Sequence, residues 1–385
     1  MIVQRKNALI AAHKASMIYS FLLPYAKLLI SLGYDVYVAC DFVDMGSIDS
    51  SACGRLKQEL ANNGIRYFQV DFPRDPFHLI RTAKALKQLK RIFGTVHFDI
   101  VHCHTPVGGV LTRLAAIKYR RTGTKVMYTA HGFHFYKGAP LKNWLLYYPA
   151  EWLCGFWTDM LITVNREDYA LAKKHMHAGR VVYVPGVGIN MEGFRPDILS
   201  QNEKQAKRES LGVENGEKMF LSVGELSMRK NHELIIKALA LMPELRYKYF
   251  IAGVGALEEH LLKLIRENGL EDKVKLLGFR TDIAALNDVA DLFIFPSLQE
   301  GLPVALMEAV ANKTPVVCSA IRGNVELVTE RSLFAPDSVE QAKERIEAYL
   351  CGELDAEPQI NFENLRFFAL PEVIGQMKEL YITQG

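Results

Sequence analysis

The sequence predicts an α/β protein built from two doubly wound parallel-sheet domains. Short apolar segments, typical of buried parallel strands, alternate with amphipathic helical segments along the chain. A segment with one proline and two glycines, Pro185–Asn190, interrupts that alternation. The length of 385 residues suits two domains of ordinary size. We therefore expect one domain at residues 1–187 and a second at 188–365.

In the first half, β-branched and aromatic residues mark strands at residues 7–12, 35–40, 65–70, 99–104, 125–130, 160–164 and 181–184. Apolar residues at helical spacing predict helices between several of these strands, at residues 17–32, 55–63, 78–93 and 109–121. Gly33 and Gly64 follow two of the helices, as glycine often does at helix ends. This order predicts a parallel sheet with helices on its faces.

The second half repeats the alternation after a polar stretch at residues 197–209. Strands are predicted at residues 219–223, 247–252, 274–277, 291–295 and 316–318. Helices are predicted at residues 231–241, 257–269, 283–290, 304–310 and 342–350. Ligands of such sheets bind beyond the carboxyl ends of the strands, so we expect the site there.

Charge and composition restrict the setting. Residues 1–195 carry 25 Lys+Arg and 13 Asp+Glu, or +12, so the remainder carries −9 of the net +3. The basic half indicates an anionic partner or membrane, or else ordinary surface variation. The six cysteines form no C-x-x-C pair, which suits reduced thiols. No signal-peptide pattern and no apolar run of about 18 residues is present, so we expect a cytosolic protein.

The segment Phe295–Val317 organises the second half. A strand ends at Pro296, a short loop follows, and a helix begins near Pro303. The N–H groups of a helix N-terminus bind phosphate well. Glu300 and Glu308 lie on either side of this N-terminus. Carboxylates would repel a phosphate, so we expect them to bind hydroxyl groups that flank it, as on a sugar and a ribose.

Glycines follow several strands. The first strand leads into Ala12-His-Lys-Ala-Ser16 rather than G-x-G-x-x-G, which argues against an NAD site. Gly253-Val-Gly255 has no third glycine, so a tight turn is favoured over a dinucleotide site. In the segment Gly224–Asn231, Arg229 and Lys230 could neutralise a diphosphate, or they could be solvated loop residues.

Histidines and aromatic residues leave alternatives open. His102, His104 and His131 end two predicted strands, where they could hold a metal or form a packed polar cluster, and the second is favoured because no carboxylate accompanies them. Residues 133–157 are dense in aromatic side chains with two lysines, which suits either a membrane interface or a packed core. The basic helix at 78–93 could lie on an anionic leaflet.

The E-x7-E pattern of Glu300 and Glu308, together with Gly224–Lys230, Gly253–Gly255 and Gly278–Arg280, resembles the family 4 retaining glycosyltransferases. That family has the GT-B fold, in which two Rossmann-like domains face each other across a cleft. Residues 102–113 and 129–138 resemble its bacterial EpsD-like group, which builds capsule and exopolysaccharide. The resemblance also implies that a last helix, at about 366–385, returns to the first domain.

The resemblance implies roles for individual residues. Glu300 would hold donor-sugar hydroxyls, Glu308 the ribose hydroxyls, and Lys230 with Arg229 the diphosphate. The remaining implied donor contacts are Gly301, Leu302 and Pro303 near the sugar and phosphates, and Gly278, Phe279 and Arg280 at the base. His131 would lie near the transferring sugar and form the catalytic set with Glu300 and Lys230. His13, Lys14 and Ser16 would approach the phosphates or the acceptor.

The function implied is transfer of a sugar, with retention, from a nucleotide donor, most often UDP-linked, to a lipid-linked glycan at the inner face of the membrane. No metal or other cofactor and no nucleic acid is implied. Two departures stand out: Glu225 replaces a common arginine, and the loop after the first strand lacks its usual glycines. A UDP-N-acetylglucosamine 2-epimerase and a non-catalytic nucleotide-sugar-binding subunit are the alternatives.

Overall fold

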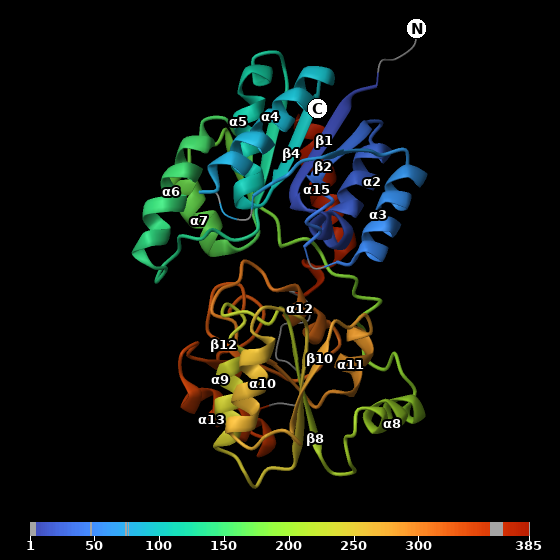
Figure 1. Ribbon diagram of the computed structural model, residues 1–385, viewed down its shortest axis with the longest axis vertical. Helices are drawn as coiled ribbons and strands as arrows, with labels where there is room; N and C mark the ends of the chain where they lie inside the picture. The colour runs from blue at the N-terminus through green and yellow to red at the C-terminus, as the bar shows by residue number, and fades with distance from the viewer. Residues whose placement is uncertain (1–4, 47, 74, 76, 355–364, 385) are drawn as a thin grey trace. The chain divides into compact units, whose positions relative to one another are not determined.

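The computed structural model describes residues 5–46, 48–73, 75, 77–354 and 365–384. The chain forms two compact units: unit 1 comprises Met1–Gly188 and Pro371–Gly385, and unit 2 comprises Ile189–Leu370. Each unit contains a parallel sheet with helices on both faces (Figure 1). The predicted fold class, α/β with two doubly wound sheets, is confirmed.

The sheet of unit 1 has seven strands in the order β3-β2-β1-β4-β5-β6-β7, all paired in parallel. The strands are β1 (Asn7–Lys14), β2 (Asp35–Asp41), β3 (Arg66–Gln69), β4 (Ile100–His104), β5 (Lys125–Ala130), β6 (Met160–Thr163) and β7 (Arg180–Tyr183). Strands β1, β4 and β5 are neighbours, so the side chains that follow them meet at one edge of the sheet.

Helices cover the two faces of this sheet. One face carries α1 (Ala15–Met17), the π-helical segment η1 (Ile18–Leu22), α2 (Leu23–Ser31), α3 (Ser50–Asn62) and α15 (Leu370–Gln384). The other carries α4 (Leu79–Thr95), α5 (Pro106–Arg120), α6 (Leu141–Gly155) and α7 (Arg166–His175). None of the helices in the described part of the chain is long and apolar enough to cross a membrane.

Helix α15 ends the chain and packs in unit 1, where Val373, Met377 and Tyr381 are buried in the same core as β1 and β2. The implied returning helix at about 366–385 therefore begins at Leu370, and its last residue, 385, lies outside the described residues. The start of this helix is bonded to the segment that joins the two units, because the Leu370 N–H donates to the Ile189 carbonyl at 2.9 Å.

The sheet of unit 2 has six strands in the order β10-β9-β8-β11-β12-β13. The strands are β8 (Lys218–Val223), β9 (Tyr247–Ala252), β10 (Val274–Gly278), β11 (Leu292–Phe295), β12 (Val316–Ser319) and β13 (Leu333–Phe334). One face packs against α9 (His232–Ala240), α10 (Glu258–Glu267) and α13 (Val339–Leu350). The other packs against α11 (Ile283–Val289) and α12 (Val304–Ala311). A 3₁₀ turn, η2 (Glu330–Ser332), precedes β13.

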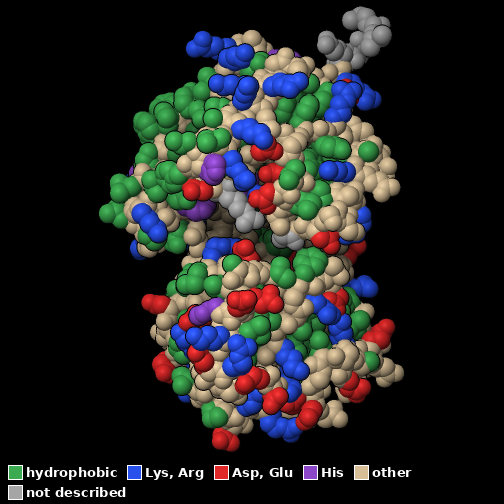
Figure 2. Space-filling view, in the orientation of Figure 1, with side chains coloured by type: hydrophobic (Ala, Val, Ile, Leu, Met, Phe, Trp, Pro, Cys, Tyr) green, Lys and Arg blue, Asp and Glu red, His purple; other side chains and the backbone are tan. Residues whose placement is uncertain are grey.

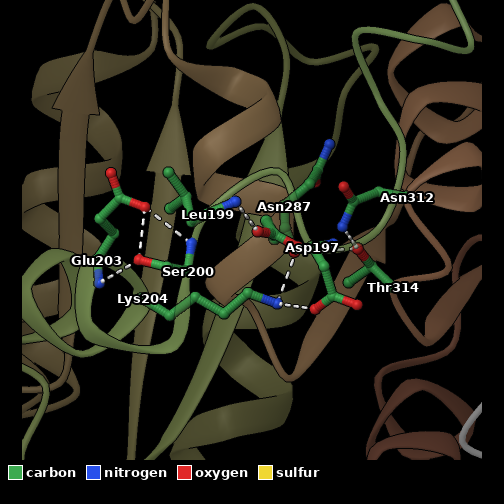
Figure 3. A network of polar contacts seen from close by, with 9 residues as sticks. Asp197, Leu199, Ser200, Glu203, Lys204, Asn287, Asn312 and Thr314 are labelled. Atoms are coloured by element: carbon green, nitrogen blue, oxygen red, sulfur yellow. Dashed lines mark hydrogen bonds and ion pairs between the residues drawn. The ribbon is translucent and has the colours of Figure 1, made fainter.

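The polar stretch at 197–209 was not predicted to be a helix, but it contains all but the last residue of α8 (Gln201–Ser210). This helix buries no residue, so it has no apolar stripe to reveal it. Side chains hold it instead: Ser200 and Glu203 form a capping box at its N-terminus. Lys204 forms an ion pair with Asp197 (Figure 3). It also pairs with Asp288 of α11.

Helix α7 and strand β13 were also not predicted. Helix α7 is short and rich in charged residues, and the Asn165 side chain caps it by accepting from the Asp168 N–H at 2.8 Å. Strand β13 spans only two residues, Leu333 and Phe334. Strand β13 is too short for a periodic pattern, and α7 buries only Asp168 and Ala172, so it has no apolar stripe for the sequence to reveal.

Candidate active site

In unit 2, three predicted residues meet beyond the carboxyl ends of β8 and β11. The Lys230 Nζ lies 2.8 Å from Glu300 Oε1, and the Arg229 Nη1 lies 2.9 Å from the same oxygen. The Lys230 Nζ also lies over the ring of Phe295, 4.6 Å from its centroid. The three side chains therefore form one charged cluster with two cations on one carboxylate, which we call the Lys230 cluster.

Glycines make room for this cluster. A Cβ at position 224 would lie 3.1 Å from Cδ and Cε of Lys230, so a larger residue would displace the lysine stem. A Cβ at position 253 would lie 1.9 Å from the Gly224 carbonyl oxygen, which no side chain tolerates. The Gly253 N–H donates to the Gly278 carbonyl at 2.8 Å. These contacts make Gly253–Gly255 a tight turn that supports the strand ends.

The charge state of Lys230 is set by burial and by its neighbours. Desolvation lowers its pKa, Glu300 opposes that effect, and Arg229 lowers it further. The negative charge of Glu225 also raises the pKa of Lys230, so the residue that replaces a common arginine acts on the same cluster. Glu225 itself is exposed at the edge of the site. The pKa of Lys230 therefore depends on two carboxylates, Glu300 and Glu225, and on one neighbouring cation, Arg229.

Helix α12 begins directly after Gly301, Leu302 and Pro303, and no side chain caps its N-terminus. Glu308 lies on this helix, and no described residue gives its carboxylate a hydrogen bond or an ion pair. Burial raises the pKa of Glu308 to about 7. A buried carboxylate without a partner is costly, so this position is suited to a ligand that donates hydrogen bonds.

The predicted base-binding segment lies at the end of β10. Gly278 is the last residue of that strand, and the Phe279 ring is 62% exposed. The Arg280 guanidinium is bidentate on Asp282, at 2.8 and 2.6 Å. Asp282 was not among the predicted residues, although its place two positions after Arg280 was a usable signal. Lys207 also pairs with Asp282, so both cations hold its pKa well below the usual range.

In unit 1, the predicted residues follow β1 and β5. His13 Nε2 lies 3.2 Å from the Phe72 carbonyl oxygen, and burial lowers the pKa of this histidine. Lys14 is ion-paired with Asp44, and the Ser16 N–H donates to the Met45 carbonyl at 3.0 Å. The positive charge of Lys14 is therefore balanced by the carboxylate of Asp44.

His131 follows β5 and contacts a histidine that the sequence did not assign to the site. Its Nε2 lies 3.0 Å from Nδ1 of His104, the last residue of β4. Burial lowers the pKa of His131 to about 4 and that of His104 well below its usual value. Both imidazoles are therefore neutral at pH 7. No group of His, Cys, Asp or Glu in the described part of the chain is arranged to hold a metal ion.

The structure thus brings the predicted site residues together in two groups. The group in unit 2 contains the Lys230 cluster, the N-terminus of α12 and Glu308. The group in unit 1 contains His131 at the end of β5, with His13, Lys14 and Ser16 at the end of β1. Sequence reasoning grouped His104 with His131 in a polar cluster without giving it a role at the site, and it missed Asp282, which holds Arg280.

Comparison with known proteins identifies both halves. Residues 21–189 match the family described as Glycosyltransferase Family 4, and residues 203–362 match Glycosyl transferases group 1. The putative glycosyltransferase EpsD of Bacillus subtilis is 40% identical over 317 residues, covering 81% of this chain and 78% of that protein. An Escherichia coli UDP-Gal:alpha-D-GlcNAc-diphosphoundecaprenol alpha-1,3-galactosyltransferase is 30% identical over 275 residues, covering 69% of each.

Solved structures share the fold. Anabaena HepE in complex with UDP-glucose superimposes with a TM-score of 0.76 at 19% identity, covering 98% of this chain and 99% of that one. WaaG, a glycosyltransferase involved in lipopolysaccharide biosynthesis, gives a TM-score of 0.70 at 19% identity, covering 97% of this chain and 98% of that one. The two Rossmann-like sheets of this chain, its family matches and its relatives together show that it belongs to the family 4 glycosyltransferases and is a hexosyltransferase of the GT-B fold.

Proposed function

We propose that the enzyme transfers a hexose or N-acetylhexosamine from a UDP-linked donor to a lipid-linked glycan, with retention, during synthesis of a bacterial surface polysaccharide. The observation that carries this proposal is the Lys230 cluster beside the uncapped N-terminus of α12, with the carboxylate of Glu308, which has no partner among the described residues, on the same helix. Cations and helix N–H groups suit a diphosphate. The carboxylates suit the hydroxyls of the sugar and ribose on either side of it.

The relatives support the proposed donor and acceptor. HepE was solved with UDP-glucose, and the E. coli relative is named for UDP-Gal and a diphosphoundecaprenol acceptor. EpsD, AmsK and WcaL lie among the relatives, and the names of the last two refer to amylovoran and colanic acid biosynthesis. These likenesses support a UDP-sugar donor and a lipid-linked acceptor for this chain.

The proposed chemistry needs charge stabilisation above all. When the bond between the anomeric carbon and the phosphate oxygen breaks, negative charge develops on the departing UDP. Arg229, Lys230 and the helix N-terminus stabilise that charge. The acceptor hydroxyl attacks the same face through an oxocarbenium-like state, and its proton passes to the departing phosphate oxygen. His131 would contact the transferring sugar, and Glu300 would bind its hydroxyls.

A panel of nucleotide sugars tests the donor first. We expect a UDP-sugar to raise the melting temperature, because a ligand of the native state stabilises it by mass action. Transfer to a diphospholipid-linked acceptor then follows, and NMR of the product gives the anomeric configuration. An inverted product would overturn retention. An epimer formed from UDP-N-acetylglucosamine alone would favour the epimerase, and donor binding without transfer or hydrolysis would favour a non-catalytic subunit.

We propose further that protein cations neutralise the diphosphate without a divalent metal. Arg229 and Lys230 already provide two positive charges at this position. Adding EDTA to the transfer assay should leave the rate unchanged. A rate that falls with EDTA and returns with Mg²⁺ or Mn²⁺ would contradict this part of the proposal.

We also propose that unit 1 rests on the inner face of an anionic membrane through helix α6. Its inner side packs Trp144 and Tyr148 against Phe135. Its outer side exposes Leu141 (73%), Leu145 (67%), Leu146 (46%), Trp152 (38%) and Leu153 (48%), and Phe156 directly after the helix is 49% exposed. Figure 2 shows hydrophobic side chains gathered over this part of unit 1. The inner side of α6 therefore fits the packed core expected as one alternative for residues 133–157. Its exposed outer side supports the other alternative, a membrane interface.

Helix α4 presents a second, smaller apolar surface next to cations. Leu79 is 75% exposed and Ile80 is 79% exposed at the start of this helix. Its buried residues are Ala85, Leu89, Ile92 and Phe93. Exposed leucine and isoleucine beside Arg81 and Lys84 suit an anionic lipid surface.

Vesicle flotation tests the membrane contact. We expect the protein to float with vesicles of phosphatidylglycerol and phosphatidylcholine more than with phosphatidylcholine alone. The double variant Leu141→Asp/Leu145→Asp should reduce the bound fraction at least about fivefold, because it removes two apolar anchors and adds negative charge. Val43→Asp is a matched control, since Val43 is 78% exposed outside α6. Equal binding by all three proteins would contradict the proposal.

A further inference from the structure

His104 is held by contacts that a packed core residue does not need. It is fully buried at the end of β4, and its ring lies 4.1 Å from that of His102, centroid to centroid. Its Nδ1 meets His131 Nε2 at 3.0 Å. Its other ring nitrogen, Nε2, is buried and has no hydrogen-bond partner. The contact to His131 is thus the one directional bond between the His104 ring and the described residues.

A hydrogen bond between two neutral imidazoles fixes the protons on both rings. One of the two facing nitrogens must donate and the other must accept. If His131 donated, the His104 ring would carry its proton on Nε2, as a buried N–H without an acceptor. If His104 donates, that same nitrogen is a bare lone pair. An orphaned buried N–H is the rarer of the two in proteins, so donation from His104 Nδ1 is favoured.

Donation from His104 determines which nitrogen of the His131 ring carries the proton. With Nε2 accepting from His104, the proton of the neutral His131 ring must lie on Nδ1. His131 is partly exposed, and its Nδ1 has no partner among the described residues. The ring therefore offers an N–H donor on its open side, which suits an oxygen acceptor such as a sugar hydroxyl.

The support behind His104 is rigid. His102 is bonded at both ring nitrogens, to the Tyr381 hydroxyl of α15 at 2.7 Å and to Thr129 Oγ1 at 2.8 Å. Tyr25 stacks near both histidines, with ring centroids 6.2 Å from His102 and 6.4 Å from His104. A ring held on its face by bonded neighbours keeps its own Nδ1 aimed at His131.

We propose that His104 is a positioning residue for sugar transfer: it fixes the tautomer and orientation of His131 so that Nδ1–H of His131 donates to a hydroxyl of the transferring sugar. This inference rests on the proposed function, because it takes His131 as the group that contacts the sugar. It assigns a role to a residue whose own side chain lies away from the substrate.

Two substitutions at position 104 separate positioning from packing. The Asn side-chain amide lies near the place of His Nδ1, so His104→Asn can still donate to His131. His104→Leu fills similar space without a donor. We expect kcat to fall about 10- to 100-fold in His104→Leu with little change in KM, and His104→Asn to recover most of that loss. His97→Leu, at an exposed position, is the control and should transfer like wild type.

The tautomer can be measured without turnover. Long-range ¹H–¹⁵N correlation spectra of the histidine rings should show His131 protonated at Nδ1 in wild type and in His104→Asn, and a mixture of tautomers in His104→Leu. A His131 protonated at Nε2 in wild type would overturn the proposal. So would wild-type kcat in a folded His104→Leu, or equal losses in the Leu and Asn variants.

The outcomes for the proposed function are distinct from these. A wild-type protein that transfers no sugar, or a fully active His131→Ala, would overturn the assigned function of the site, while the spectra would still decide the tautomer. Thermal unfolding of each variant confirms that it is folded before the kinetics are compared.

Discussion

The two units carry opposite chemistry at the carboxyl ends of their sheets. In unit 2, Lys230 and Arg229 share one carboxylate, so the groups at the strand ends are ionised. In unit 1, His104 and His131 meet as neutral rings whose pKa values are lowered by burial. The same sheet architecture thus holds an ionised cluster in one unit and a pair of neutral rings in the other, beside the balanced ion pair of Lys14 and Asp44. Fixed charge suits a diphosphate, and neutral donors suit an uncharged sugar.

The net charge of each half of the chain also differs from the charge of the side chains at its site. The first 195 residues carry +12 and the remainder −9, yet the cation cluster lies in the acidic half. The basic half keeps its site neutral, and its lysine near β1 is paired with Asp44. The overall charge of a domain therefore does not reveal the charge of its site, which depends on a few buried side chains.

The largest effect is expected from removing the charge of unit 2. Lys230→Ala should lower kcat/KM by about 10³-fold or more, or about 4 kcal/mol, because the departing diphosphate loses a buried cation. Lys237→Ala is the control, since Lys237 lies on the neighbouring helix α9 and is paired with Glu233. Steady-state kinetics measures both. Turnover near wild type in a folded Lys230→Ala would break the comparison.

Glu300→Ala tests the same cluster by removing its negative charge instead of a positive one. Its loss frees both cations from their carboxylate, and the site would also lose a partner for sugar hydroxyls. We expect kcat to fall about 10²- to 10³-fold while donor affinity changes less, because the cations remain for the diphosphate. Isothermal titration with UDP and with the UDP-sugar separates the two effects. A variant that loses UDP binding altogether would show that Glu300 organises the cations instead.

Glu308 gives the next effect, on stability. Its folded pKa, about 7, lies above the usual value of 4.5. The stability it contributes is fully present below about pH 4.5 and is lost as pH rises through 7. Glu308→Gln should therefore stabilise unit 2 by up to about 3 kcal/mol at pH 8 and by little at pH 4.5. Urea unfolding at both pH values measures this, and an equal effect at the two would contradict it.

The histidines of unit 1 should show the reverse dependence. Burial lowers the pKa of His102 to about 3, so the unfolded chain binds its proton first as pH falls. The stability from this neutral ring is full above about pH 6.5 and should decrease by about 2 kcal/mol between pH 6.5 and 5. His102→Gln should remove that share of the acid sensitivity. If its unfolding free energy falls as steeply as in wild type, other groups carry the dependence.

The smallest effect is expected at the support of the histidine rings. Tyr381→Phe removes only the hydroxyl that bonds to His102 Nδ1 at 2.7 Å. We expect a loss of about 1 kcal/mol in unfolding free energy and a change in kcat below about fivefold. Tyr349→Phe, on α13 of unit 2, serves as the control. A larger loss of kcat than in His104→Leu would place the main support in α15 rather than in β4.

Much of this protein could be predicted from local pattern. The alternation of strands and helices predicted both parallel sheets, because buried strands need apolar runs and covering helices need apolar stripes. Helix α8 escaped that reasoning because ion pairs and a capping box hold it instead of a buried face.

The fold class, the family and the E-x7-E spacing of Glu300 and Glu308 could be predicted from the sequence, since these depend on local periodicity and on motifs of fixed spacing. The contacts between side chains could not, because they depend on tertiary packing. Glu300 forms ion pairs with Lys230 and Arg229, which lie 70 and 71 residues before it in the chain. His104 meets His131 across two neighbouring strands. Partners and burial set the charge of each group, and both arise from packing of distant segments that no local pattern encodes.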